Sequence, residues 1–539
     1  MTLRQPRAQA RIRRIGPRPT APMKPAVRPV KLVSSNIRRV LIQITTMIAI
    51  LLGARNHVAA ADRSVATNLH LYNVGSEKQL FIDDLFFESS TNVALRVHPP
   101  VKTGEKNLAS DRPWENAMLN WFTVIQDGPR YRMWYECYDV PGWPTADDTS
   151  FCYAESTDGV HWTKPNLGLF SYQGGTNNNI LFRLIGPPTA NSRVHGTGVF
   201  IDPTAPPEAR YKCVSQGRFE QNFDPPYRIA GMQSPDGLRW TRHPEPICSI
   251  FADSQYGGFW DARLKKYVLY GRVGGRGRSL GRSESDSFHH FEPLQLVLQT
   301  DDQDPPDTDL YNPAPMRYPF AANAYFMFPS MYQHKPETLD IRMAVSRDGV
   351  HWTWPERVPF IPLGQAGEFD TGSLYIGQGM IRKGNELWQY YSGAPLRHHE
   401  AELENLVKPA NARFFGRVVS RVDGFVSVDA GTAATGGFVT PPLTFTGNIL
   451  KLNLVVRPGG SLRVGLRDEN DRIIPGYDIA DCPPIGGGTD DVDLLVRWTS
   501  GGEIGTRALK PTKLCFELKD ASLYAFRFTT GSGGPDRDH

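Results

Sequence analysis

A seven-residue phrase recurs along the chain and constrains the fold more than any other feature. It has the form S-x-D-G-x-x-W, with clear copies starting at Ser156, Ser234 and Ser346 and two weaker copies starting at Ser283 and Ser420. The Ser and Asp side chains can bind backbone groups of a tight turn, Gly supplies unusual backbone angles, and Trp anchors the turn on a core. We interpret the phrase as a structural motif that stabilises a hairpin and has no chemical role. Its copies mark the repeat units and so indicate how many there are.

The amino-acid sequence between the copies of the phrase is typical of β-structure. From residue 79 to about residue 425, short aromatic and β-branched runs alternate with turns rich in Gly, Pro, Asn and Asp. Each repeat can be written as a four-stranded unit, and five such units predict a five-bladed β-propeller. Residues 426–529 have alternating strands without the phrase, which predicts a β-sandwich of the jelly-roll type. We therefore expect an all-β chain that ends in a disordered tail at residues 530–539.

The first 61 residues have the pattern of an export signal. They carry twelve Lys or Arg residues and no acid, and small residues at 59–61 follow an apolar run from Val40 to Ala54. That run is shorter than the roughly 20 residues of a comfortable transmembrane helix. We predict an exported protein, whether periplasmic, cell-surface or extracellular, that has no stable membrane insertion after signal removal. An uncleaved membrane anchor is the alternative.

The charge of the remaining chain argues against nucleic acid as a partner. The whole chain has a net charge of +4, but without residues 1–61 it has 48 basic and 56 acidic residues, or −8. The six cysteines permit disulfides in an exported protein, and Cys137 and Cys152 could face each other on successive strands. No cysteine pair has the spacing of metal ligands, so no metal site or cofactor is predicted. A structural calcium ion is left open.

The register of the repeats also predicts where a site would lie. In a propeller, the residues that precede the innermost strand of each unit converge at one mouth of the central channel. At these positions the chain carries acids, and we predict catalytic roles for Glu115, Asp253, Asp309 and Glu368. Carboxylates that face each other suit the hydrolysis of a glycosidic bond, although an acid before a strand is also a common turn former. The predicted substrate-binding residues are Trp114, Asn116, His195, Tyr311, Asn312, Asp370 and His398.

Two other motifs were weighed and given no catalytic role. Asp83 and Asp84 form an early acidic pair, but their setting in an apolar strand favours a structural role in closing the ring. Residues 272–278 read R-V-G-G-R-G-R, which resembles a phosphate loop only superficially. The segment follows a strand but opens no helix, so nucleotide binding is discarded.

These motifs resemble the five-bladed propeller glycoside hydrolases, the superfamily that contains families 32 and 43. The phrases ending at Trp162, Trp240 and Trp352 look like the hairpins of those families. The stretches L-F-I-D-D from residue 80, R-P-W-E-N from residue 112 and D-G-F from residue 423 resemble exported planctomycete proteins that join a propeller to a β-sandwich.

The resemblance implies three acids around the channel. Glu115 could match the nucleophile or base of the first blade, although the families have Asp there. Asp253 or Asp309 could match the acid that modulates a pKa, and Glu368 could match the general acid on a later blade than expected. The W-x-N-D-P-x-G and R-D-P motifs of family 32 are missing. Glu136 and Cys137 imitate its E-C pair but lie on a middle strand, so that role is not carried over.

The sequence therefore predicts an exported glycoside hydrolase-like protein that cleaves a complex carbohydrate by paired carboxylates in the channel. The alternative is a non-catalytic carbohydrate-binding or cell-surface interaction protein on the same scaffold. A glycan phosphorylase would also need a cluster of Arg or Lys residues to hold phosphate, and the sequence shows little sign of one.

Overall fold

The computed structural model describes residues 71–139, 149–183, 194–219, 223–251, 253–398, 413–507 and 509–531. The predicted leader and the predicted tail beyond residue 531 lie outside these ranges. Every element with described bounds is a β-strand or a short 3-10 helix, which confirms the all-β fold. Among the described residues, no helix has the length and apolar character needed to cross a membrane. The 3-10 helices are η1 (Asp84–Phe86), η2 (Pro113–Glu115), η3 (Pro207–Ala209), η4 (Ile479–Asp481) and η5 (Gly505–Arg507).

The first three predicted units each form a separate sheet in a propeller-like arrangement. The first contains β6 (Met118–Asp127), β7 (Arg130–Tyr138), β8 (Thr149–Ser156) and β9 (Ile180–Arg183). The second contains β10 (His195–Ile201), β11 (Tyr211–Arg218), β12 (Tyr227–Ser234), β13 (Thr241–Arg242) and β14 (Cys248–Phe251). The third contains β15 (Gly257–Asp261), β16 (Lys266–Gly275), β17 (Gly277–Ser285) and β18 (Gln295–Leu298).

The strands of the last two predicted units are divided differently. One four-stranded sheet contains β20 (Pro315–Arg317), β21 (Tyr325–Met327), β24 (Ala344–Ser346) and β25 (Trp352–Thr353). An eight-stranded sheet contains β19 (Thr308–Leu310), β22 (Ser330–Gln333), β23 (Thr338–Ile341), β26 (Ser373–Ile376), β27 (Ile381–Lys383), β28 (Glu386–Ala394), β29 (Phe414–Arg421) and β5 (Val101–Lys102). Because these sheets do not separate into two units, the count of five blades stays a prediction.

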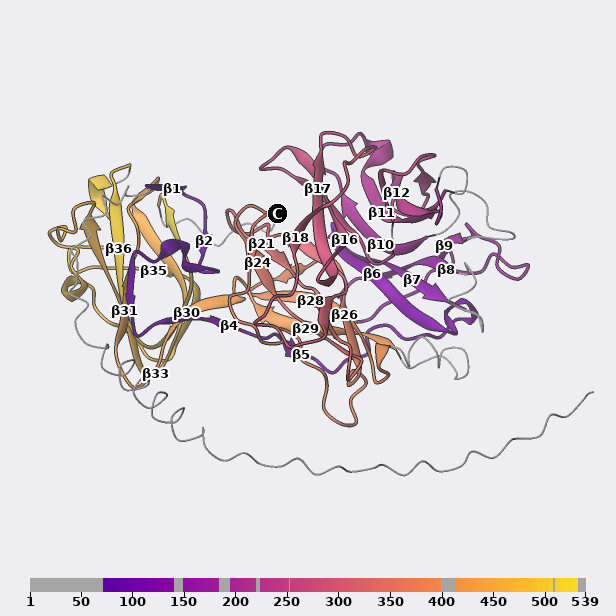
Figure 1. Cartoon of the computed structure of the whole chain (residues 1–539). Helices are drawn as coiled ribbons and strands as arrows, with labels where there is room; N and C mark the ends of the chain where they lie inside the picture. The colour runs from indigo at the N-terminus through magenta and orange to yellow at the C-terminus, as the bar shows by residue number, and fades with distance from the viewer. Residues whose placement is uncertain are drawn as a thin grey trace, which may run out of the picture. The chain divides into compact units, whose positions relative to one another are not determined.

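The C-terminal region shares its sheet with the start of the described chain. This eleven-stranded sheet contains β1 (Tyr72–Gly75), β2 (Gln79–Leu80), β3 (Ser89–Thr91), β4 (Ala94–Val97), β30 (Val426–Ala430), β31 (Gly436–Val439), β32 (Leu443–Phe445), β33 (Ile449–Asp468), β34 (Ile485–Gly486), β35 (Thr489–Leu495) and β36 (Thr512–Thr529). Figure 1 shows indigo β1 and yellow β36 in this group, and β32 lies between them in the order of the sheet. A boundary at residue 79 therefore does not separate the sheets. The predicted domain limits and the β-sandwich stay predictions.

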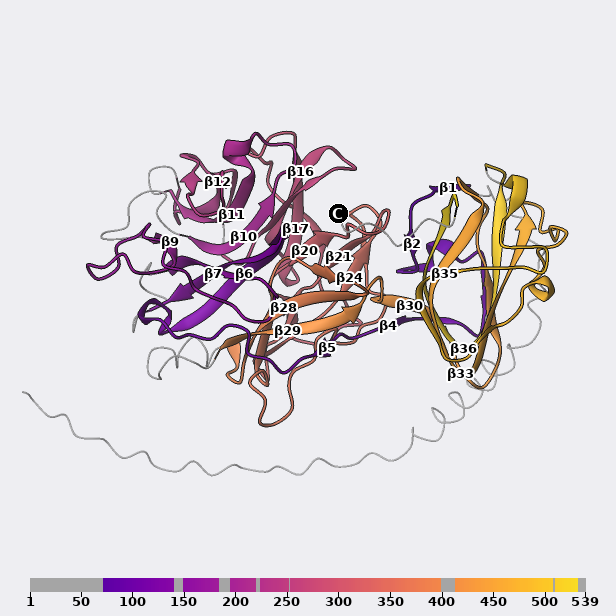
Figure 2. The same ribbon diagram turned by 180° about the vertical axis from the view of Figure 1, so that it is seen from behind.

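Hydrogen bonds between units hold the inner strands together. The backbone N–H of Gln378 donates to Phe122 O at 3.0 Å, and its side-chain amide donates to Tyr256 O at 2.5 Å. The side-chain amide of Gln255 donates to Phe122 O at 3.3 Å and to Thr197 O at 3.2 Å. These contacts bring β6, β10, β15 and β26 together, and Figure 2 shows β6 beside β10. The residues that precede the inner strands are thereby placed around one axis.

The repeated phrase joins one unit to the next. In the copy at Ser234, the serine hydroxyl accepts hydrogen bonds from the backbone N–H groups of Asp236 and Gly237, at 3.3 and 2.9 Å. The carbonyl of Gly237 then accepts a hydrogen bond from Trp134 Nε1 of the first unit, at 2.6 Å. Gly237 has a φ of 73° and lies against the Trp134 ring, so both its backbone angle and its lack of Cβ are required.

The same arrangement recurs in the other clear copies. The hydroxyl of Tyr390 donates to Gly159 O, and the hydroxyl of Tyr270 donates to Gly349 O. Tyr270 lies on β16, in the unit before its turn, whereas Tyr390 lies on β28 of the last predicted unit and contacts the turn of the first. The phrase therefore fastens neighbouring units to each other as well as closing its own hairpin.

The contacts of Asp83 and of the two cysteines Cys137 and Cys152 bear on two further structural predictions. Asp83 caps η1 and pairs with Arg347 at 2.7 Å, which fits the predicted structural role of this acid. Cys137 and Cys152 do face each other, as buried thiols with their sulfur atoms 3.6 Å apart.

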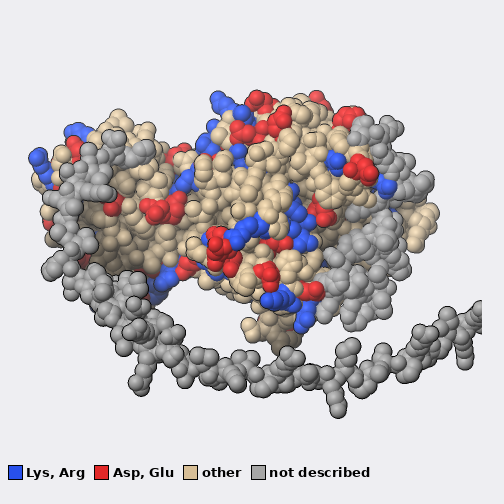
Figure 3. All heavy atoms as spheres, viewed as in Figure 1, with Lys and Arg blue, Asp and Glu red and all other residues tan. Residues whose placement is uncertain are grey.

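On the face drawn in Figure 3, basic and acidic side chains are interspersed over the surface.

Candidate functional site

Aromatic residues from distant parts of the chain meet at the end of the inner strands. Trp121 of β6, which is only 4% exposed, stacks on Tyr311 with ring centroids 6.3 Å apart and meets Tyr375 edge-on at 4.9 Å. His398 packs against Tyr311 at 4.8 Å and against Tyr332 at 4.9 Å. We call Trp121, Tyr311, Tyr332, Tyr375 and His398 the aromatic cluster. Rings of this kind suit stacking against sugars.

Trp121 is placed in the aromatic cluster by an irregularity in its strand. The pairing of β6 with β7 shifts between Leu119 and Phe122, so Asn120 and Trp121 lie outside the regular ladder. The indole Nε1 of Trp121 is buried and has no hydrogen-bond partner in the part of the chain that the structure describes. A buried donor without a partner is costly, which makes it a natural group for a ligand to satisfy.

Asp309 is the buried acid beside this aromatic cluster. Its side chain is 3% exposed, and its Oδ2 accepts from Arg278 Nη1 at 3.1 Å and contacts His334 Nε2 at 3.0 Å. Its Oδ1 is buried and has no hydrogen-bond partner among the described residues. Asp309 is therefore a buried carboxylate that the described residues hold by one oxygen only.

A hairpin supplies the arginines that surround Tyr311. The β16–β17 hairpin places the guanidinium groups of Arg272 and Arg278 over the Tyr311 ring, at 4.4 and 5.2 Å. At its tip, Gly277 has a φ of 69°, and a Cβ there would lie 3.0 Å from Asp309 Cβ. Only glycine allows this close approach. The charge of Asp309 raises the pKa of Arg278 despite the opposing effect of burial.

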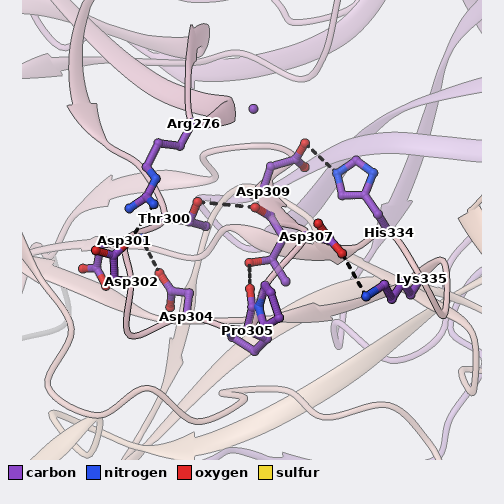
Figure 4. A pocket seen from close by; sticks show the side chains of 13 residues that line it. Arg276, Thr300, Asp301, Asp302, Asp304, Pro305, Asp307, Asp309, His334 and Lys335 are labelled. Carbon is purple, nitrogen blue, oxygen red and sulfur yellow. Dashed lines mark hydrogen bonds and ion pairs between the residues drawn. The ribbon is translucent and has the colours of Figure 1, made fainter. Parts of the chain in front are cut away.

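A pocket of about 730 Å³ adjoins Asp309. In Figure 4, Asp309 and His334 lie together on one side, while Asp301, Asp302 and Asp304 gather near Arg276. Residues of the loop 300–309 form most of its lining, together with Lys335. The described residues contain no group of three or more His, Cys, Asp or Glu side chains suited to hold a metal ion. The pocket is therefore a polar cavity whose acids are balanced by nearby bases.

A second carboxylate, Glu136, is held against His195. Glu136 is fully buried on β7, and its Oε1 contacts His195 Nδ1 at 2.6 Å. Tyr138 and Asn120 donate to the same oxygen, and Gly196 N–H donates to Oε2 at 2.7 Å. Burial alone would raise the pKa of Glu136, but the His195 charge and these hydrogen bonds bring it below its ordinary value.

The Glu136–His195 pair lies near the aromatic cluster. We call the region that contains this pair, Asp309 and the aromatic cluster the mouth. Gly196, next to His195, lies against the backbone of Ser254, whose hydroxyl donates to Tyr311 O at 3.0 Å. On the other side, Asn120 contacts Glu136 and is followed directly by Trp121. The mouth thus combines a carboxylate–imidazole pair, an available carboxylate oxygen and stacked rings.

Glu115 has a different setting from the one its sequence position predicts. Its Oε1 accepts from Tyr135 at 2.6 Å, and its Oε2 pairs with Lys164 at 2.6 Å in a fully buried site. Its neighbour Trp114 is buried and donates to Asn179 at 3.0 Å, whereas Asn116 is exposed. No described contact joins these three residues to Asp309 or to the aromatic cluster, so their predicted roles stay predictions.

Asp370 repeats this arrangement in the last unit. Its Oδ2 accepts from Tyr391 at 2.8 Å and pairs with Lys102 at 2.6 Å. Glu368 is exposed, and its carboxylate accepts from the backbone N–H of Gln365 at 2.6 Å, as a turn former does. Neither acid has a described contact with Asp309.

The structure does bring together other predicted residues. Asp253 is exposed and pairs with Arg272 at 3.1 Å, so it reaches Tyr311 through that arginine. Tyr311 and His398 touch directly, and Asp309 reaches Tyr311 through Arg278. Asn312 is buried beside them, where its Oδ1 accepts from Ser330 N–H at 3.4 Å.

Several residues of this mouth were missed by the sequence reasoning. They are Trp121, Glu136, Arg272, Arg278, Tyr332, Tyr375 and Arg413. A signal existed for three of them: the R-V-G-G-R-G-R run carries Arg272 and Arg278, and the E-C pair carries Glu136. Both motifs were set aside because they fitted no known phosphate loop or blade position.

Comparisons with known proteins give likeness only to solved structures. No family model and no curated protein matches the chain. A structure described as a glycoside hydrolase has 13% identity and a TM-score of 0.44 over 60% of this chain and 92% of its own. A thermostable family-43 glycoside hydrolase has 12% identity and a TM-score of 0.39, over 60% and 95%.

A third similar structure belongs to a different class of enzyme. It is an N-acetylgalactosamine deacetylase from F. plautii in complex with blood group B trisaccharide, with 15% identity and a TM-score of 0.41 over 61% of this chain and 96% of its own. At these values the likenesses carry no argument about activity, which must come from the site.

Proposed function

We propose that the chain is an exported carbohydrate-active enzyme that hydrolyses a glycosidic bond at this mouth. The observation that carries the proposal is Asp309, a buried carboxylate beside stacked rings, one oxygen of which has no partner among the described residues. Hydrolysis of a glycosidic bond needs one group that protonates the leaving oxygen and another that activates water or attacks directly. The stacked rings supply the apolar faces that hold a sugar.

The two proton-transfer groups take distinct roles in this proposal. Asp309 is paired with Arg278 and acts as the base that activates water. His195 uses Nδ1 to bind Glu136 and Tyr138, so its Nε2 exchanges the proton with the leaving oxygen. Glu136 does not touch the sugar; it orients the imidazole.

A non-catalytic carbohydrate-binding protein is the second candidate. It is favoured by the pairing of acids with arginines, because Asp253 pairs with Arg272 and Asp309 with Arg278. Such pairs suit the binding of sugar hydroxyl groups as well as they suit catalysis. A binding protein would retain ligands but release no product.

A glycan-library screen separates the two functions. The full chain is compared with Asp309→Asn, His195→Asn and the control Asp253→Asn, whose acid is exposed. We expect Asp309→Asn and His195→Asn to lose about 100-fold or more in kcat/KM, and Asp253→Asn to stay within a few-fold. Equal hydrolysis by the parent chain and Asp309→Asn would contradict the assignment. Binding without hydrolysis in every variant would support the second candidate.

A further inference from the structure

One buried arginine lacks the partner that the others have. Five arginines are buried among the described residues, and four of these have a carboxylate partner there. These four pairs are Arg132–Asp127, Arg282–Glu284, Arg342–Asp340 and Arg417–Glu105, at 3.3, 2.9, 2.6 and 3.0 Å. The fifth, Arg413, is 5% exposed and has no ion pair with any described residue. It is the most deeply buried of the five, and no carboxylate among the described residues compensates its charge.

The contacts of Arg413 use only part of its hydrogen-bonding capacity. Its Nη2 donates to Ser373 Oγ at 2.9 Å and its Nη1 donates to Ser392 Oγ at 3.3 Å. A guanidinium carries five N–H donors, and an isolated buried charge is unfavourable unless it is paired. In agreement, burial lowers the pKa of Arg413, an effect that the nearby tyrosines only partly oppose.

Arg413 lies at the mouth described above. Ser373 begins β26, and Arg413 directly precedes β29, at the same end of the sheet. The guanidinium lies over the Tyr375 ring at 5.1 Å. Tyr375 contacts Trp121 and binds His398 at 3.0 Å. A ligand stacked on the aromatic cluster would therefore lie next to this uncompensated charge.

The other two arginines of the mouth do not provide such a charge. Arg272 pairs with Asp253 and Arg278 pairs with Asp309, so each is balanced by an acid. Arg413 is thus the group whose complement is missing from the described protein. Its planar fork matches a carboxylate, sulfate or phosphate through two parallel hydrogen bonds.

We propose that the ligand bound at this mouth carries an oxyanion that pairs with Arg413. This proposal rests on the proposed function, because it names the substrate class of the same site. The expected ligands are acidic carbohydrates that bear a uronic acid carboxylate or a sulfate ester. Free inorganic phosphate has the same chemistry and is the other source to be distinguished.

Ligand-dependent thermal unfolding and calorimetry of the full chain test the proposal. The probes are an oligogalacturonide, a sulfated galacto-oligosaccharide, a neutral galacto-oligosaccharide of equal length, and inorganic phosphate alone. We expect an acidic probe to raise the Tm of the parent chain and the neutral probe to have little effect. In Arg413→Gln, binding of the acidic probe should weaken by about 10- to 100-fold. Arg413→Lys should restore part of it.

The stability of the variants distinguishes a ligand site from a structural one. Arg413→Gln removes an uncompensated charge, so its Tm without ligand should equal or exceed that of the parent chain. The matched control Arg342→Gln removes a similarly buried arginine but leaves the Asp340 carboxylate without its ion-pair partner. Its Tm should therefore fall. If Arg413→Gln loses as much stability as Arg342→Gln, Arg413 is structural and the proposal is overturned.

The remaining outcomes also decide the question. Three results would each overturn the proposal: equal binding of acidic and neutral probes, no binding of any acidic probe or of phosphate, or acidic binding that survives in Arg413→Gln. Binding of phosphate alone would support it and assign the oxyanion to a free ion. Hydrolysis of neutral glycans by both the parent chain and Arg413→Gln would overturn this inference but keep the proposed function. Binding of an acidic probe without hydrolysis would keep this inference but overturn the proposed function.

Discussion

Three buried acids at predicted site positions have different surroundings. Glu115 and Asp370 lie just before β6 and β26, whereas Asp309 lies within β19. Glu115 accepts a hydrogen bond from Tyr135 of β7 and pairs with Lys164, and Asp370 accepts one from Tyr391 of β28 and pairs with Lys102. The two lysines also occupy similar positions: the Lys164 ammonium lies 5.8 Å from the centre of the Tyr135 ring, and the Lys102 ammonium lies 5.7 Å from that of Tyr391. Asp309 instead takes its partners from the neighbouring hairpin and from His334, and keeps one oxygen without a partner.

The difference shows what makes one of these acids a candidate for chemistry. A tyrosine and a lysine bind the carboxylate of Glu115 and that of Asp370, so the contacts of these two acids are structural. Asp309 faces Tyr332 across its strand pair, and no lysine is paired with it among the described residues. The comparison predicts that the first two acids matter mainly for stability and the third mainly for activity.

The largest stability effect is expected for Glu115→Gln. The change leaves the Lys164 ammonium, which is 5% exposed, with a weaker set of partners. Breaking a buried ion pair from one side typically costs 3–5 kcal/mol, and because Lys164 keeps Asp111 we expect about 3 kcal/mol. Urea unfolding measures the loss.

A double variant gives the control for Glu115. Glu115→Gln combined with Lys164→Met removes both charges and should recover part of the lost stability. A change below about 1 kcal/mol in the single variant would mean that Glu115 is not the structural acid its contacts indicate.

The next effect is expected for Glu136→Gln, and it depends on pH. The pKa of Glu136 in the folded protein lies below its ordinary value of 4.5, so the carboxylate contributes stability that is fully present above that value. The contribution is lost as the pH falls through the folded pKa. Relative to the parent chain, we expect the variant to lose about 2 kcal/mol at neutral pH, with the difference shrinking below pH 4.5.

The pH series of unfolding free energies decides this prediction. A difference between parent and variant that stays constant, or grows, as the pH falls would contradict the depressed pKa. The control is Glu368→Gln, an exposed acid whose removal should cause little change at any pH.

A smaller effect is expected for Asp370→Asn. The pair repeats that of Glu115, but the Lys102 side chain is 20% exposed and can be solvated once its partner is neutral. We expect a loss of about 1 kcal/mol, measured in the same urea experiment. A loss larger than that of Glu115→Gln would break the equivalence of the two arrangements.

The sequence could predict the position of these acids but not their partners. The repeated phrase at Ser156, Ser234 and Ser346 marks the all-β repeats and the register that points to Asp309 and Tyr311. Some of the partners lie far away in the sequence: Arg278 lies 31 residues before Asp309, and Lys102 lies 268 residues before Asp370. Over such distances no local sequence pattern predicts the pairing.

The motifs that were set aside show the same limit. Arg272 and Arg278 fitted no phosphate loop, yet a hairpin folds both onto Tyr311. Glu136 lies on a middle strand, but the irregular pairing of β6 brings Asn120 to its carboxylate, and His195 arrives from the next unit. Which strand a residue belongs to was therefore a poorer guide than which end of the strand it occupies.

The smallest stability effect is expected for Asp309→Asn, although its effect on activity should be the greatest. The asparagine can still accept from Arg278, whose side chain is 33% exposed and partly solvated. We therefore expect the unfolding free energy to change by less than about 0.5 kcal/mol while kcat/KM falls about 100-fold or more. A loss of stability comparable to that of Glu115→Gln would erase the distinction between the two kinds of acid. Unchanged stability with lost activity would establish that an acid in this fold is available for chemistry only where no tyrosine and lysine of the fold bind it.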